Sequence, residues 1–181
     1  MEKVEVLILR NLLYNEEYLR KVIPFIKAEY FEDLHQKVVF EEMLKFVEEY
    51  NTASTKEVLC IEVEKRQDIN DTSFQEITKL ISYLEDVPTD YEWLVNTTEK
   101  WCRDRAIYLA LMESISLADG KDEKKDRDAI PGILSDALAV SFDSNVGHDY
   151  LLDYEARYES YHRKEDKIEF DLEYFNKITK G

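Results

Sequence analysis

Glycine and proline are scarce in this chain, and their scarcity constrains the fold more than any other feature. Only four glycines and three prolines occur among 181 residues. Folds rich in β-strands need many tight turns, which these two residue types commonly supply. Apolar residues instead recur at helical spacing along nearly every segment. The sequence therefore predicts an all-α protein, in which a helical bundle is followed by longer helical elements.

Five helices are expected before residue 90. The first covers Val4–Tyr14, and the second is a short segment that Asn15 caps and Pro24 interrupts. The third covers Asp33–Tyr50. The fourth runs from a capping box at Ser54 to about Arg66, and the fifth runs from Asn70 to before Pro88. The helix over 33–50 has the clearest amphipathic pattern. Its expected apolar face consists of Leu34, Val38, Val39, Met43, Phe46, Val47 and Tyr50.

The longest expected helix runs from about Asp90 to Asp119. Its middle, residues 106–112, is apolar on every side, so it must be buried on more than one side. A charged loop follows, and Pro131 suits the first turn of a return helix that ends near residue 140. From this second helix Leu134, Leu138 and Phe142 are expected to pack back on the first. Residues 90–142 therefore predict a helical hairpin, whose remaining apolar surface is available to a second subunit.

Two further apolar segments follow the expected hairpin. Residues 149–163 carry Leu151, Tyr154, Tyr158 and Tyr161 at spacings of three, four and three. Such a stripe needs a groove. Two interpretations stay open, a connector that docks elsewhere and a last core helix. The tail, residues 168–181, is more apolar than a loose terminus. It predicts the entry to a second domain that continues past the last residue.

The net charge of −16 opposes binding of nucleic acid to the general surface, because phosphates attract basic faces. An acidic surface suits solubility or basic protein partners. The chain contains no G-x-x-x-x-G-K-[ST] loop, no G-x-G-x-x-G turn and no C-x-x-C pair. No apolar run approaches the roughly 20 residues that a membrane span requires. We therefore expect no catalytic residue, no cofactor and no membrane partner for this chain, and two reduced cysteines, Cys60 and Cys102.

A metal site is the main chemical alternative. Glu32 with His35, and Glu159 with His162, each form the Glu-x-x-His pattern used by di-iron carboxylate bundles. Glu32, however, stands at a helix start, where an acid suits the helix dipole. Glu159 falls in the expected connector, outside any bundle. We therefore predict no metal ligands, and a di-iron bundle remains the less favoured hypothesis.

Several stretches resemble the replicative DNA helicases of T-even-type bacteriophages, which belong to the DnaB-type hexameric helicase family. The most specific ones are residues 141–161 and 175–181. Shorter ones are residues 28–32, 80–84, 93–95 and 98–100. The similarity runs in register over the whole chain and is weakest over residues 119–128.

The resemblance implies a division of the chain into four parts. Residues 1–89 would form a globular helical bundle, 90–142 a hairpin that pairs subunits, 143–167 a linker helix, and 168–181 the lead-in to a RecA-like motor that the chain lacks. The parent enzyme would use ATP or GTP with magnesium to move 5′ to 3′ on single-stranded DNA, in the cytoplasm of the infected bacterium. Its implied partners are further copies of itself (a dimer, a trimer of dimers or a hexamer), primase, a helicase loader, and single-stranded DNA through the motor.

The resemblance also assigns contact residues by position. Those expected at the subunit interface of the hairpin are Trp101, Ile107, Tyr108, Leu111, Ile115, Leu134 and Leu138. Those expected to dock the linker are Leu151, Tyr154, Tyr158 and Tyr161. The function expected is thus assembly and recruitment, without catalysis by this chain. A stand-alone acidic adaptor or DNA mimic is the alternative from a different class, because it would also explain the charge.

Overall fold

The computed structural model describes residues 3–120, 126–142, 158 and 162, and the described part is helical without strands. Its elements are α1 (Val4–Tyr14), α2 (Glu16–Val22), the 3-10 helix η1 (Ala28–Tyr30), α3 (Leu34–Tyr50), α4 (Lys56–Glu64), α5 (Asp71–Tyr83), α6 (Tyr91–Ala118), the 3-10 helix η2 (Arg127–Ala129) and α7 (Ile130–Leu138). The all-α class predicted from the sequence is confirmed for these residues.

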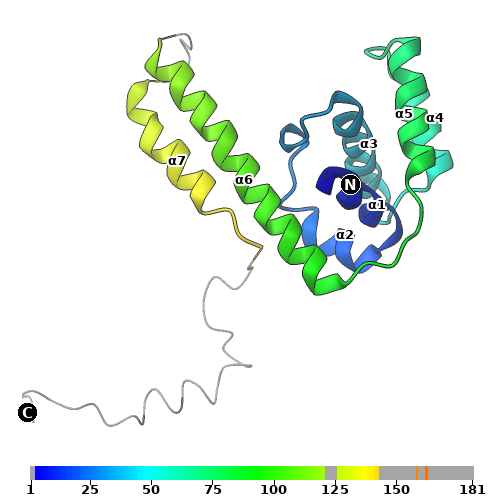
Figure 1. Ribbon diagram of the computed structural model, residues 1–181, viewed down its shortest axis with the longest axis horizontal. Helices are drawn as coiled ribbons and strands as arrows, with labels where there is room; N and C mark the ends of the chain where they lie inside the picture. The colour runs from blue at the N-terminus through cyan, green and yellow to red at the C-terminus, as the bar shows by residue number, and fades with distance from the viewer. Residues whose placement is uncertain (1–2, 121–125, 143–157, 159–161, 163–181) are drawn as a thin grey trace, which may run out of the picture. The chain divides into compact units, whose positions relative to one another are not determined.

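Helices α1 to α5 form a bundle in which α3 is the central element (Figure 1). Helix α3 contacts α1, α4, α5 and η1, so it is covered on more than one side. This explains why Phe40, absent from the predicted apolar face, is fully buried. The predicted face was wrong at its two ends, where Leu34 and Tyr50 are exposed. Which residues of α3 are buried therefore depends on the several elements that pack around this helix, and the buried residues do not form one continuous stripe.

Side-chain caps begin most of these helices at the residues that the sequence indicates. Asn15, Asp33, Asn70 and Asp90 each accept a hydrogen bond from a backbone amide of the first turn. The capping box predicted at Ser54 was wrong by one residue. The hydroxyl of Thr55 caps α4 and accepts from the amide of Val58 at 3.4 Å, while Ser54 is buried.

A cluster of charged side chains joins α3 to the segment after α4. The guanidinium of Arg66 donates to the carboxylates of Glu41 and Glu42, both at 2.9 Å, and to Asp68 at 2.6 Å. Glu42 is buried, and Lys45 supplies its second partner at 2.6 Å. The hydrogen bonds from Arg66 lower the pKa of Asp68 to about 2. A buried carboxylate is tolerated here because two cations compensate its lost hydration.

A buried hydrogen bond joins α6 to the bundle. The side-chain oxygens of Tyr18, on α2, and Thr98, on α6, are 2.6 Å apart, and both residues are fully buried. Because Thr98 donates its hydroxyl proton to the carbonyl of Leu94, at 2.8 Å, the Tyr18 hydroxyl acts as the donor to Thr98. Burial raises the pKa of Tyr18, so the phenol stays protonated in this role. The contact fixes the first half of α6 at one point on α2.

We expect Thr98→Val to destabilise the protein more than Tyr18→Phe. Valine has a similar shape but leaves the buried Tyr18 hydroxyl without an acceptor, which costs about 1–3 kcal/mol. Phenylalanine removes the donor and leaves Thr98 bonded to Leu94, so its cost is that of one hydrogen bond, about 1 kcal/mol. Urea unfolding measures the loss of unfolding free energy in each variant and shows which loss is larger. Equal losses, or a larger loss for Tyr18→Phe, would contradict this assignment of donor and acceptor.

Candidate subunit-contact surface

Helix α6 is 28 residues long, which corresponds to about 42 Å at 1.5 Å per residue. Its buried residues form one narrow stripe, with a buried side chain at about every fourth position. They are Leu94, Thr98, Cys102, Ala106, Ala110, Ser114 and Leu117. Helix α6 contacts α1, α2 and η1, and its later part lies beside α7, which returns antiparallel to it (Figure 1). One face of the helix therefore serves both the bundle and α7.

The segment that follows α7 packs against the bundle and α6. The ring of Phe142 stacks on Phe25 with 4.7 Å between centroids, and Phe142 is buried. Arg103, on α6, donates its Nε proton to the carbonyl of Val140 at 3.0 Å. Two small residues on α6, Ala106 and Ala110, are buried on the side of the helix that faces α7. The position of α7 is thus set by apolar packing along its length and by a ring stack at its end.

A second apolar face of α6 has no cover among the described residues. It consists of Tyr108, Leu111, Met112 and Ile115, whose exposed fractions lie between 47% and 56%. We call these four residues the α6 stripe. Their positions, i, i+3, i+4 and i+7, place them on one side of the helix. Grouped apolar side chains that remain in water are typical of interaction surfaces.

Arg105 lies beside the α6 stripe and engages residues of the bundle. Its Nε proton is donated to the carbonyl of Tyr30 at 2.8 Å, and its guanidinium pairs with Glu32. The guanidinium also lies 5.0 Å from the centre of the Tyr108 ring, a cation–π geometry. These contacts orient Tyr108 at one end of the stripe.

The contacts of Glu32 also bear on the metal hypothesis. Its carboxylate is engaged by Arg105, and the imidazole of His35 lies 3.6 Å from the carboxylate of Asp33. Within the described part of the chain no three His, Cys, Asp or Glu side chains come together as a metal site would require. Glu159, the glutamate of the other Glu-x-x-His pattern, lies outside the described residues.

The predicted contact residues differ in their positions. Tyr108, Leu111 and Ile115 belong to the α6 stripe, and Leu138 on α7 is 65% exposed. The expectation that Leu138 packs back on α6 was wrong, because this side chain faces solvent. Sequence reasoning missed Met112, although its place four residues after Tyr108 indicates the same face.

The other predicted hairpin residues are engaged in the protein's own core. Trp101 packs against the rings of Tyr30 and Phe31, with centroid distances of 6.1 and 5.1 Å. Ile107 and Leu134 are partly buried and also pack on the core. These three side chains are therefore less available to a second molecule than the α6 stripe.

Of the four predicted linker residues, the structure describes Tyr158. Leu151, Tyr154 and Tyr161 lie outside the described residues. Tyr158 is exposed, and its ring stacks on His162 with 4.0 Å between centroids. This is the i, i+4 contact of a helix, and it tests neither of the two interpretations of the segment.

Both cysteines are free, as expected; Cys60 is half-buried and Cys102 is buried. Cys102 is fully buried on the face of α6 that packs against the protein's own core, and burial raises the pKa of its thiol to about 12. A thiol of this pKa is almost entirely protonated near neutral pH and is a poor nucleophile. Among the described helices none is long and apolar enough to cross a membrane.

Comparison with known proteins gives one informative relative. A DnaB-like replicative helicase of Enterobacteria phage T4 is 38% identical to the chain over 183 aligned residues. The resemblance to the replicative helicases of T-even-type phages is therefore confirmed. The alignment covers 97% of the chain but only 38% of the T4 helicase, so the chain spans well under half the length of this relative. No protein-family model matches the chain.

Truncation of two apolar side chains near the end of α7 should affect the stability of the protein very differently. We expect Phe142→Ala to lower the free energy of unfolding by about 3–5 kcal/mol, because a buried ring is lost and a cavity remains. Leu138→Ala should change it by less than about 0.5 kcal/mol, since Leu138 is exposed. Urea unfolding at one low protein concentration measures both. Comparable losses for the two variants would contradict the stack on Phe25.

Proposed function

We propose that this chain is the assembly and recruitment region of an ATP-dependent replicative DNA helicase that moves 5′ to 3′ at the fork. The relation to the T4 helicase over 97% of the chain is the observation that carries the proposal. In this role the chain pairs subunits, forms a collar in a ring of helicase subunits, and docks primase and a helicase loader. The acidic-adaptor alternative accounts for the charge but not for this relation.

The α6 stripe supports the pairing part of the proposal. Four large apolar side chains are about half exposed on one face, and a second copy would present the same face in return. Complete burial of one such side chain is worth about 1.5–3 kcal/mol, so covering the exposed half yields about 1 kcal/mol each. Eight such side chains, four from each copy, would together contribute about 8 kcal/mol. This gain offsets part of the entropy that is lost on association.

The remaining steps of the helicase reaction belong, in this proposal, to protein outside these 181 residues. A RecA-like motor would bind the nucleotide, the magnesium ion and single-stranded DNA. Residues 143–167 would link this region to the motor of a neighbouring subunit, and residues 168–181 would lead into the motor. Both segments lie outside the described residues, Tyr158 and His162 excepted. The site of action would be the cytoplasm of the infected host cell.

The pairing is tested by placing charge in the α6 stripe. We expect the double variant Leu111→Glu, Ile115→Glu to remain folded and to become monomeric, because carboxylates at an apolar interface lose their hydration without gaining a partner. Sedimentation velocity measures the mass, and circular dichroism checks the helix content. Both substitutions occur at exposed positions, so the fold of one copy should tolerate them.

Ile61→Glu is the matched control for this experiment. Ile61 is an equally exposed isoleucine, at 52%, but it lies on α4 and away from the α6 stripe. This variant should keep the mass of the unsubstituted protein. An unchanged mass for the double variant, or an equal loss of mass for Ile61→Glu, would show that α6 does not form the interface.

A further inference from the structure

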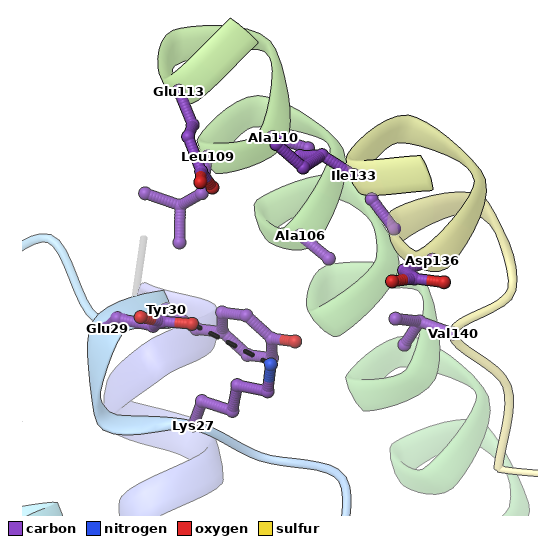
Figure 2. A pocket seen from close by; sticks show the side chains of 11 residues that line it. Lys27, Glu29, Tyr30, Ala106, Leu109, Ala110, Glu113, Ile133, Asp136 and Val140 are labelled. Atoms are coloured by element: carbon purple, nitrogen blue, oxygen red, sulfur yellow. Dashed lines mark ion pairs between the residues drawn. The ribbon is translucent and has the colours of Figure 1, made fainter. Parts of the chain in front are cut away.

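A groove of about 510 Å³ separates η1 from the α6 and α7 pair (Figure 2). Its volume lies within the ~300–1,000 Å³ that is typical of ligand clefts. The floor is apolar and is formed by Ala106, Leu109 and Ala110 of α6 together with Ile133 and Val140. The two alanines leave room above α6 where larger residues would fill the space. The floor therefore suits aliphatic side chains from another molecule.

The rim of the groove is mainly acidic. Glu29 lies on the η1 side, and Glu113 and Asp136 lie on the α6 and α7 side (Figure 2). Among the described residues that line the groove, Lys27 is the basic one, and its charge is already engaged. Its Nζ atom lies 3.8 Å from the Glu29 carboxylate and 5.9 Å from the centre of the Tyr30 ring.

Asp136 differs from the other acids of the rim because no described residue compensates its charge. No ion pair or hydrogen bond joins its side chain to another described residue, and it is exposed on α7. The Tyr30 hydroxyl points across the groove toward this side (Figure 2). The groove thus combines an apolar floor with an exposed carboxylate at its edge.

We propose that this groove binds a basic segment of a partner protein, in which a Lys or Arg side chain reaches Asp136 while neighbouring aliphatic side chains lie on the floor. The inference rests on the partner-docking part of the proposed function, and it is independent of pairing through the α6 stripe. Charge complementarity decides the class of occupant. A second copy of a chain with net charge −16 brings mostly further acid, and nucleic acid brings phosphate.

The groove is tested with short random peptides displayed on phage and selected on the full chain. We expect the enriched peptides to combine Lys or Arg with Leu, Ile or Val. One enriched peptide, made synthetically, should shift the methyl NMR signals of Leu109, Ile133 and Val140. Its affinity should fall as salt is raised, because the attraction between opposite charges is screened. A version with Gln in place of its basic residues should bind at least about tenfold more weakly.

Substitutions at the rim make the test specific. Asp136→Lys should weaken the peptide about tenfold or more, whereas Asp136→Glu, which keeps the charge, should retain binding. Glu92→Lys is the matched control, since it makes the same charge change at an exposed position at the start of α6. This control should alter the affinity less than twofold.

Several outcomes would overturn the proposal. They are enrichment of peptides without basic residues, equal binding by Asp136→Lys, and methyl shifts confined to other surfaces. A change of mass in Asp136→Lys without loss of peptide binding would assign the groove to self-association instead. The Leu111→Glu, Ile115→Glu variant separates the two hypotheses. If it becomes monomeric and still binds the peptide, the groove functions without pairing. If its mass is unchanged and it still binds the peptide, only the pairing proposal is lost.

Discussion

The length of α6 is the constraint on which the remaining structure depends. A helix of about 42 Å extends past the bundle that α1 to α5 can build, so its later turns need other cover. Helix α7 supplies that cover on the buried face, and it can do so because the ring of Phe142 returns the chain to the bundle. The other face of these turns, which no described residue covers, carries the α6 stripe. Surface for assembly is thus a direct result of a helix longer than its domain.

The elements of the fold were largely predictable from the sequence because their signals are local. Polar caps such as Asn15 and Asp90, and Pro131 in the first turn of α7, mark helix starts through hydrogen bonds and φ preferences within a few residues. The error at Ser54 shows the limit of this reasoning. Ser54 and Thr55 both carry a hydroxyl, but Ser54 is buried and Thr55 caps the helix.

Burial was less predictable, since it depends on neighbours that are remote in sequence. Phe40 and Leu34 are both apolar residues of α3, yet one is fully buried and the other exposed. Periodicity identified residues 106–112 as apolar on every side, and the resemblance assigned Tyr108, Leu111 and Ile115 to a subunit contact. It could not separate them from Trp101, which is packed on η1 and the bundle. The groove beside η1 joins segments about 80 positions apart and has no local signal.

The stack of Phe142 on Phe25 also has a mechanical consequence. It fixes the last described residue of this region to the bundle, at the base of the α6 and α7 pair. A force that arrives through the chain after residue 142 therefore acts on the bundle first and does not peel α7 from α6 turn by turn. Two rings packed face to face resist such a load together with the core around them.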